Sequence, residues 1–268
     1  MSSLFRLARA FRPRTTPSTF FHSNTALGRT QNLKHARFYT PRTPPPRIPI
    51  PTPTTNPVAA KQTIIYALLG INTTIYGYSI YANALAEQNY PAKMYAFIHN
   101  MTLNLNAFRD EKRYWTALTA TFTHLSLTHF ACNMFVFYTM GQFLVRLPII
   151  TPARFLIIVF GSGLLGSAGY LQNRARKVPA GAYDRSRGVG FSGALMGITT
   201  VAACFYPHAQ MMLMGVIPMP LWVLTLGFAA VDGYFLNDET SRIGHAGHLG
   251  GMAFGAAYYL IRLRGLRI

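Results

Sequence analysis

Four polar side chains stand inside otherwise apolar stretches of this sequence, and together they could carry out acyl transfer. A serine and a neutral imidazole, here Ser192 and His248, are the minimal nucleophile and general base for attack on a carbonyl. His129 and Asn133 are spaced i, i+4 and would project from one face of a helix. Their side chains, with the backbone N–H of Ser192, would supply donors for the oxyanion formed in that attack.

Each of these residues also allows a simpler interpretation. A serine between glycines often packs a helix and bonds its own backbone, and a His–Asn pair often forms an interhelical hydrogen bond. Ala194 stands where the elbow of the α/β-hydrolases has its last glycine, and no strand precedes Ser192, which argues against that site. No Asp or Glu lies within the predicted helices that carry Ser192, His248 and His129, so we expect a Ser–His dyad and not a full triad.

Metal and cofactor sites are not expected. His245 and His248 are spaced i, i+3, but no third ligand is evident near them in the sequence. Cys132 and Cys204 both lie in apolar runs, so neither a disulfide framework nor a cysteine metal site follows. We therefore predict chemistry that needs no metal and no cofactor.

The charge pattern predicts the elements that must hold these residues. After Lys61, runs without any charged residue alternate with charged segments; the runs are 62–86, 114–145, 155–173, 188–231 and 243–261. One bilayer crossing needs about 20 apolar residues, and the run 188–231 is long enough for two, with a break at Tyr206-Pro207-His208. We therefore predict an all-α fold, a polytopic bundle of six transmembrane helices. The mixed segment 88–113 suits a folded first loop at the membrane interface.

Six crossings in series would bring the polar residues to one level. Helices two, four and six must begin on the same side of the membrane. Ser192 and His248 follow charged residues by five and six positions, which is about 8–9 Å in from the boundary if the intervening residues are helical. Counting back about 20 residues from Arg146 puts His129 just inside the same boundary. Three segments would therefore converge near one depth.

Small residues predict which helices approach each other. Gly247, Gly251 and Gly255 repeat every four residues on one stripe of the sixth helix. Such a stripe lets a neighbouring backbone come close, and Gly193 and Gly197 offer a matching stripe on the fourth helix. This packing would bring the imidazole of the sixth helix within reach of the hydroxyl of the fourth.

Composition and charge describe the rest of the chain. The 268 residues are 50% hydrophobic and 12% charged, with a net charge of +18, and a typical soluble domain has about twice that charged fraction. The first acidic residue is Glu87, and much of the basic excess precedes it, so a nucleic-acid partner is not indicated. Residues 1–39 are predicted to be a mitochondrial presequence cleaved after Tyr39, residues 40–60 a proline-rich extended linker, and residues 61–268 the membrane domain.

These motifs resemble those of the rhomboid intramembrane serine proteases of the mitochondrial type. The resemblance covers about residues 61–268 and is carried by His129-Phe130-Ala131-Cys132-Asn133, Gly190-Phe191-Ser192-Gly193 and Gly247-His248-Leu249-Gly250-Gly251. It implies that Ser192 is the nucleophile and His248 the general base. It also implies that His129 and Asn133 are the side chains of the oxyanion hole, that the first loop lies at the interface, and that the fifth helix is a substrate gate.

The sequence departs from the family pattern at one position and leaves two histidines without a role. Met196 stands where several bacterial members carry a Tyr that stacks on the catalytic histidine, so the resemblance does not tell how His248 is oriented. His124 and His245 have counterparts in some members, and no role for them follows from the sequence.

The resemblance implies a multi-pass endopeptidase of the mitochondrial inner membrane that cuts single-pass transmembrane proteins in the lipid bilayer. Helical peptide bonds are inaccessible, so substrates with Gly or Pro in the span are expected. A catalytically silent rhomboid-like protein that binds transmembrane clients stays open, as does a small transporter, although the inverted repeats expected of a transporter are not seen. Charge does not decide the orientation, because basic residues follow the sixth helix and also crowd the loop 174–187. Nothing in the sequence indicates an oligomeric state.

Overall fold

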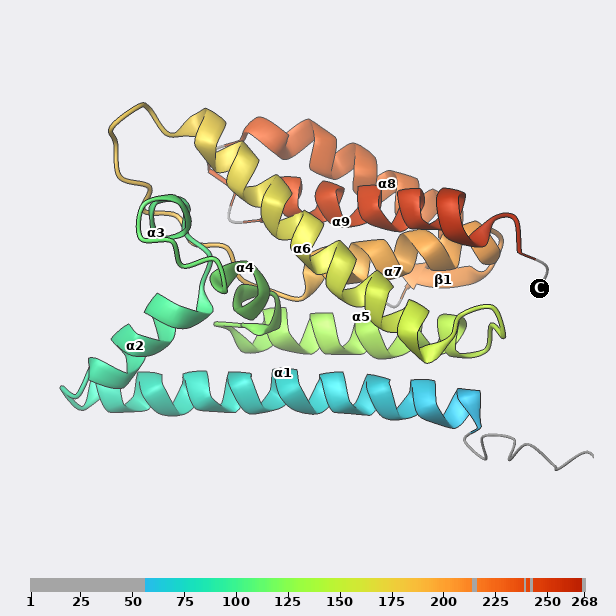
Figure 1. Ribbon diagram of the computed structural model, residues 1–268, viewed down its shortest axis with the longest axis horizontal. Coiled ribbons are helices and arrows are strands. Elements are labelled where there is room, and N and C mark those ends of the chain that lie inside the picture. Colours follow the sequence, from blue (N-terminus) through green and yellow to red (C-terminus); the bar gives the residue numbers. More distant parts are fainter. Residues whose placement is uncertain (1–55, 214–215, 239, 242, 267–268) are drawn as a thin grey trace, which may run out of the picture. The chain divides into compact units, whose positions relative to one another are not determined.

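The computed structural model (Figure 1) describes residues 56–213, 216–238, 240–241 and 243–266. The predicted presequence, residues 1–39, and the linker up to residue 55 lie outside the described residues. The first helix begins at Pro57, so the last four residues assigned to the linker belong to that helix.

Six longer helices lie where the six spans are predicted. They are α1 (Pro57–Glu87), α5 (Leu127–Val145), α6 (Pro152–Lys177), α7 (Ser192–Phe205), α8 (Leu221–Tyr234) and α9 (His245–Tyr258), and a π turn, Tyr259–Leu263, follows α9. The break predicted near Tyr206 is present, because α7 ends at Phe205. By length and composition, only α6 among the described helices is long and apolar enough to cross a membrane. Helix α7 and the segment Leu221–Asn237 are apolar but shorter, so the six-span count stays a prediction.

The starts of the helices follow ordinary capping chemistry. The side chain of Asn56 accepts from the N–H of Val58 and Pro57 opens α1, while Ser126 and Thr151 cap α5 and α6 through their hydroxyl oxygens. Each cap satisfies an N–H group that has no partner within its own helix. These caps therefore define the first turns of α1, α5 and α6.

The first loop is folded, as predicted. It contains α2 (Ala92–Met101), α3 (Leu105–Arg109), α4 (Thr116–Thr119) and a 3-10 turn, Ala120–Phe122. The guanidinium of Arg113 is buried between the carbonyl oxygen of His99 and the carboxylate of Glu111. These bonds join the loop's segments into one unit at the end of the bundle where α5 begins (Figure 1).

A β-hairpin connects α7 to α8, which the all-α prediction did not include. Strand β1 (Gln210–Leu213) pairs antiparallel with β2 (Ile217–Pro220), with Met211 opposite Met219. The hairpin lies at the end of the bundle opposite the first loop (Figure 1). The described fold is therefore helical, as predicted, apart from this short hairpin.

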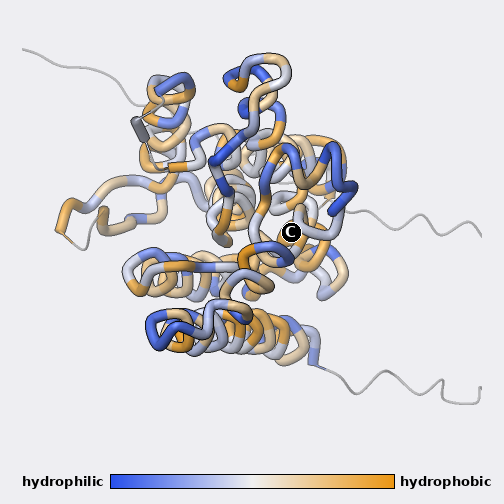
Figure 2. The backbone as a smooth tube through the Cα atoms, turned by 90° about the vertical axis from the view of Figure 1, so that its left-hand side faces the viewer, coloured by the Kyte–Doolittle hydropathy of each residue, from blue (hydrophilic) through white to orange (hydrophobic). Residues whose placement is uncertain are grey.

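The helices run alternately between two ends of the molecule. Figures 1 and 2 show α1 at one edge beside α5, with the other helices stacked above them. Helices α5, α7 and α9 all begin toward the end that carries α2, α3 and α4 (Figure 1). This is the arrangement predicted for helices two, four and six.

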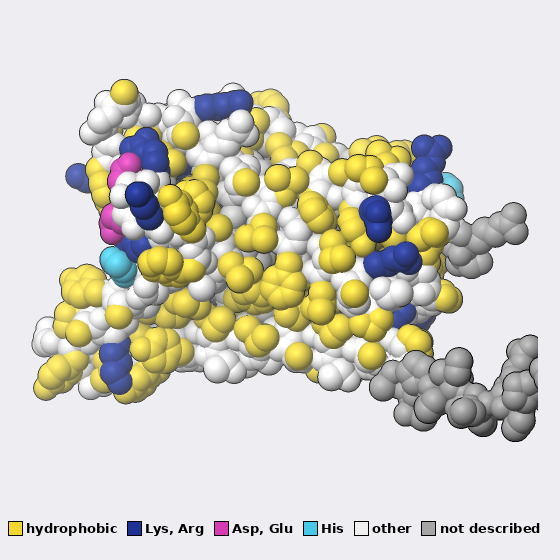
Figure 3. All heavy atoms as spheres, in the orientation of Figure 1, with side chains coloured by type: hydrophobic (Ala, Val, Ile, Leu, Met, Phe, Trp, Pro, Cys, Tyr) yellow, Lys and Arg dark blue, Asp and Glu magenta, His cyan; other side chains and the backbone are white. Residues whose placement is uncertain are grey.

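The interior and the visible surface are both apolar. Phe137, Phe155 and Ile198 are fully buried at the centre of the core, whereas Phe135 and Ile157 face outward. On the face shown in Figure 3, hydrophobic side chains cover the middle, and most charged groups lie toward the two ends. A wide apolar belt between polar ends is what a bilayer would cover.

Candidate active site

Ser192 is the first residue of α7 and follows a loop with an unusual backbone. Gly190 has a φ of +122°, which L side chains rarely adopt. Its N–H donates to the carbonyl oxygen of Ala120 at 2.9 Å. Phe191 is fully buried and packs edge-on against Phe137. The loop is therefore held from both sides, and it presents Ser192 to a cavity.

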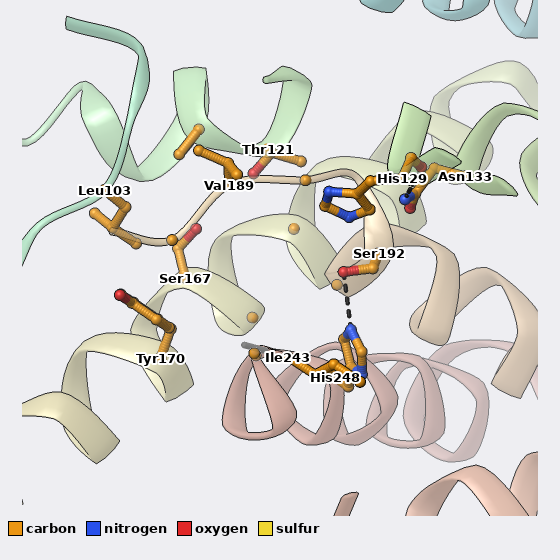
Figure 4. Close-up of a pocket in the computed structure, with 18 residues that line it drawn as sticks. Leu103, Thr121, His129, Asn133, Ser167, Tyr170, Val189, Ser192, Ile243 and His248 are labelled. Atoms are coloured by element: carbon orange, nitrogen blue, oxygen red, sulfur yellow. Dashed lines mark hydrogen bonds between the residues drawn. The ribbon is translucent and has the colours of Figure 1, made fainter. Parts of the chain in front are cut away.

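The side chains of Ser192 and His248 meet in that cavity. The Oγ of Ser192 lies 2.9 Å from the Nε2 of His248, although the two residues come from α7 and α9 (Figure 4). The contact predicted between the fourth and sixth helices is therefore present. At this distance the hydroxyl proton can pass to the imidazole.

Glycines allow this approach, as the small-residue stripes predict. A Cβ added at Gly251 would collide with the carbonyl oxygen of Gly193, and one at Gly255 would lie 2.5 Å from that of Gly197. Helix α6 also joins this contact, which was not predicted. A Cβ at Gly166 would lie 2.8 Å from a carbonyl oxygen of α9.

His129 and Asn133 lie on the α5 side of Ser192, opposite His248 (Figure 4). One N–H of the Asn133 amide donates to the carbonyl oxygen of His129 at 2.7 Å, and the amide has a second N–H to offer. A Cβ at Gly190 would lie 2.5 Å from the His129 ring. The glycine thus makes room for the imidazole beside the serine.

Two cavities meet at this site. The first has a volume of about 480 Å³ and is lined by Ser192, His248, His129 and Asn133 together with Tyr170. The second, of about 550 Å³, lies among α5, α7, α8 and β1 and also reaches Ser192 and Asn133. Its other walls are mainly apolar side chains, which include Phe135, Val136, Met196, Leu224 and Phe228. The serine therefore stands where a cavity with polar side chains meets an apolar one.

Residues 111–265 match the Rhomboid domain. This matched region is more than half of the chain, and it contains every site residue described above. The chain belongs to the rhomboid family. Three relatives illustrate its place there. "RHOMBOID-like protein 12, mitochondrial" of Arabidopsis thaliana is 28% identical over 169 residues, which is 59% of this chain and 49% of that protein.

Two further relatives give similar identities and coverages. "Presenilin-associated rhomboid-like protein, mitochondrial" of Homo sapiens is 28% identical over 146 residues, 53% of this chain and 36% of that protein. "Rhomboid protein 1, mitochondrial" of Saccharomyces cerevisiae is 26% identical over 201 residues, 74% and 52% respectively. The chain thus spans about half or less of the length of these relatives. Their names and the shared domain support a mitochondrial membrane protein.

This rhomboid site contains an acidic residue that was not expected. Asp232, near the end of α8, is 3% exposed, and both its carboxylate oxygens lie 3.1 Å from the Nδ1 of His248. The expectation that no acid stands beside this imidazole was wrong. It rested on the helices that carry Ser192, His248 and His129, whereas the carboxylate comes from the fifth helix. The only signal in the sequence is that Asp232 directly follows the charge-free run 188–231.

The two histidines without a role in the sequence also have partners here. His124 is fully buried, and its Nε2 accepts from the N–H of Phe191 at 3.4 Å, so it braces the residue before the serine. His245 contacts the same carboxylate as His248, with its Nδ1 2.7 Å from Asp232 Oδ1. Among the described residues, no group of three or more His, Cys, Asp or Glu is suited to hold a metal ion.

Proposed function

We propose that this chain is a rhomboid-type intramembrane serine endopeptidase. The observation that carries the proposal is the 2.9 Å contact between the hydroxyl of Ser192 and the imidazole of His248, made between two helices inside a cavity of a rhomboid domain. A hydroxyl is a weak nucleophile unless an adjacent base takes its proton. This pair meets that requirement.

The proposed mechanism uses the groups around the serine in turn. The Nε2 of His248 takes the proton of Ser192 as Oγ attacks the carbonyl carbon of the scissile peptide. Asn133, His129 and the backbone N–H of Ser192 donate to the oxyanion of the tetrahedral intermediate. The imidazolium then protonates the leaving amine, and the acyl group stays on Oγ. A water molecule, deprotonated by the same imidazole, hydrolyses the ester and restores the enzyme.

The proposed substrates are single-pass transmembrane proteins. The apolar cavity among α5, α7 and α8 ends at Ser192, which suits an apolar segment that arrives from the lipid. A helical segment keeps its peptide bonds hydrogen-bonded, so it must unwind before it reaches the serine, and Gly or Pro in the span favours this. We propose the mitochondrial inner membrane as the location, with the presequence at residues 1–39 as the import signal.

Cleavage of a reporter transmembrane protein by the purified chain in detergent tests the proposal. Wild type is expected to cut, whereas Ser192→Ala and His248→Ala are expected to lose at least about 10³-fold in kcat, since either change removes the activated nucleophile. Equal rates in all three proteins would refute the protease. Stable binding of the reporter without any cleavage by wild type would support a catalytically silent client-binding protein instead.

A further inference from the structure

The end of the bundle opposite the candidate site carries basic side chains and no acidic ones. The chain has seven Asp and Glu residues in all. Six of them are described, and each lies at the end where α5, α7 and α9 begin; they are Glu87, Asp110, Glu111, Asp184, Asp232 and Asp238. The seventh, Glu239, directly follows Asp238 in the sequence. On the face shown in Figure 3, acidic side chains accordingly appear only toward the left-hand end, whereas Lys and Arg appear at both ends.

The basic groups at the two ends differ in their partners. Three arginines at the site end form ion pairs within the protein; the pairs are Arg109–Asp110, Arg113–Glu111 and Arg174–Asp184. At the opposite end, Arg146 follows α5, while Arg262 and Arg264 lie in and just after the π turn; all three are exposed. A guanidinium group stays charged in proteins. Since none of the described acids lies at this end, its positive charge is not compensated within the described part of the chain.

Two further cations at this end are held against backbone carbonyl groups. The ammonium of Lys61, near the start of α1, donates to the carbonyl oxygen of Leu147 at 2.9 Å. The guanidinium of Arg154, in the first turn of α6, donates to that of Ile149 at 2.6 Å. A carbonyl oxygen carries no formal charge, so these bonds orient the cations and do not neutralise them. The turn between α5 and α6 therefore adds to the positive charge of this end.

The packing of α6 on α9 brings arginines from the two helices to a similar level. A Cβ added at Gly161 would collide with the ring of Phe254, and the two helices run in opposite directions (Figure 1). Arg154 precedes Gly161 by seven residues, and Arg262 follows Phe254 by eight. Both arginines thus lie about 10–12 Å beyond this contact toward the same end. Segments far apart in the sequence contribute to one basic surface.

Exposed apolar side chains border these arginines. Leu260 and Ile261 directly precede Arg262 and are 57% and 78% exposed. Leu263 is fully buried, so it anchors the turn that presents Arg262 and Arg264. A phospholipid offers acyl chains next to a phosphate, and this surface offers apolar groups next to cations. A free anion or a nucleic acid would use the cations alone.

We propose that the end of the bundle opposite the site binds the headgroups of anionic phospholipids through Arg146, Arg154, Arg262 and Arg264. Each guanidinium presents a planar fork of N–H donors that matches phosphate oxygens. If the apolar belt lies in a bilayer, this end lies at the bilayer surface, where basic residues next to membrane helices attract anionic lipids. The proposal goes beyond the protease function and does not depend on it, because no step of catalysis enters it.

The test measures the melting temperature of the full-length protein in neutral detergent with added lipid. Phosphatidylglycerol is the anionic probe, phosphatidylcholine with the same acyl chains is the zwitterionic reference, and glycerol phosphate supplies the phosphate without acyl chains. We expect phosphatidylglycerol to raise the melting temperature by at least about 3 °C relative to phosphatidylcholine, because a ligand of the folded state stabilises it. High salt should reduce this shift, since it screens the charges. Glycerol phosphate should leave the melting temperature unchanged.

Variants assign the shift to this surface. The triple variant Arg146→Gln/Arg262→Gln/Arg264→Gln removes three positive charges and should lose most of the phosphatidylglycerol shift. Replacing the same three residues by lysine keeps the charge and should keep the shift. Each shift is taken between the two lipids within one variant, so a general loss of stability cancels.

A matched control removes the same charge from the site end. It is the triple variant Lys112→Gln/Arg176→Gln/Arg185→Gln, in which all three changed residues are exposed. This variant should keep the wild-type shift, because the acids of that end already oppose its basic groups. Loss of the shift in the control and in the arginine variant alike would overturn the proposal, since it would show a response to net charge alone.

Three other results would also overturn it. They are no phosphatidylglycerol shift in wild type, an equal shift in wild type and in the glutamine variant of the three arginines, and a full shift with glycerol phosphate. The last would indicate a site for a free anion and not for a lipid. None of these outcomes depends on whether the reporter is cleaved, so failure of this proposal is distinct from failure of the protease proposal.

Discussion

Asn133 combines a bond within its own helix with the role proposed for it in the oxyanion hole. Its amide uses one N–H on the backbone of its own helix, and the residue also lines the cavity that holds Ser192. A donor that is fixed before the reaction stabilises an oxyanion without having to reorganise. The same bond that orients the amide therefore prepares it for the proposed role.

We expect Asn133→Ala to lower kcat for the reporter by about 10²–10³-fold while KM stays within a few fold, since the lost hydrogen bond forms fully only with the oxyanion. Steady-state kinetics on wild type and variant measure this. Thr128→Ala is the matched control, because Thr128 is exposed on the same helix. A rise in KM with kcat preserved would assign Asn133 to substrate binding instead.

The sequence predicts the reactive residues better than their supports. Ser192, His248 and Asn133 are recognisable because polar groups are rare in apolar runs. Asp232 is not recognisable in this way, because an acid at the end of an apolar run looks like any charged boundary. Its contact with His248 depends on how α8 meets α9, and one sequence contains no direct measure of that packing. The orientation of His248 could not be predicted for the same reason.

At the scale of helices, contact between backbones decides the geometry of the site. Helices α6, α7 and α9 approach through glycines, so carbonyl oxygens stand where side chains would normally be. The stripes on α7 and α9 were predictable from their period of four. The part played by Gly166 in α6 was not, because a glycine among apolar residues does not show which neighbour it faces. The β-hairpin was not predicted because Met211 and its neighbours are about as apolar as the residues of the helices on either side.

We expect Gly251→Ala to destabilise the protein by about 1–3 kcal/mol, because its methyl group would collide with the carbonyl oxygen of Gly193. The displacement of α9 should also slow fluorophosphonate labelling of Ser192. Thermal unfolding in detergent and the labelling rate measure the two effects.

Gly70→Ala is the control for that substitution. Gly70 is in α1, is exposed, and would place its Cβ in open space. Alanine has the higher helix propensity, so this variant should be unchanged or more stable by up to about 1 kcal/mol. If both variants unfolded at the wild-type temperature, close packing of α7 and α9 would not be a source of stability.

At the scale of the whole molecule, the apolar belt separates two polar ends with different contents. One end holds the folded first loop and the starts of α5, α7 and α9, and the other holds the hairpin and the end of α9 (Figure 1). The charge-free runs predicted this alternation. They could not predict the orientation in the membrane, because Arg174 and Arg176 at one end oppose Arg262 and Arg264 at the other.

If the belt spans the bilayer, the two ends must lie in different compartments whichever way the bundle is inserted. Arg109 is exposed in the first loop and Arg264 is exposed after α9, so Arg109→Cys and Arg264→Cys report on the two ends. Both are made in a background in which Cys132 and Cys204 are changed to Ser. In sealed mitoplasts, a membrane-impermeant maleimide should label one variant and spare the other, and detergent should expose both. Labelling of Arg109→Cys would put the site on the intermembrane-space side. Labelling of both variants before detergent would contradict a bundle that crosses the membrane, because α9 would then have both of its ends on one side.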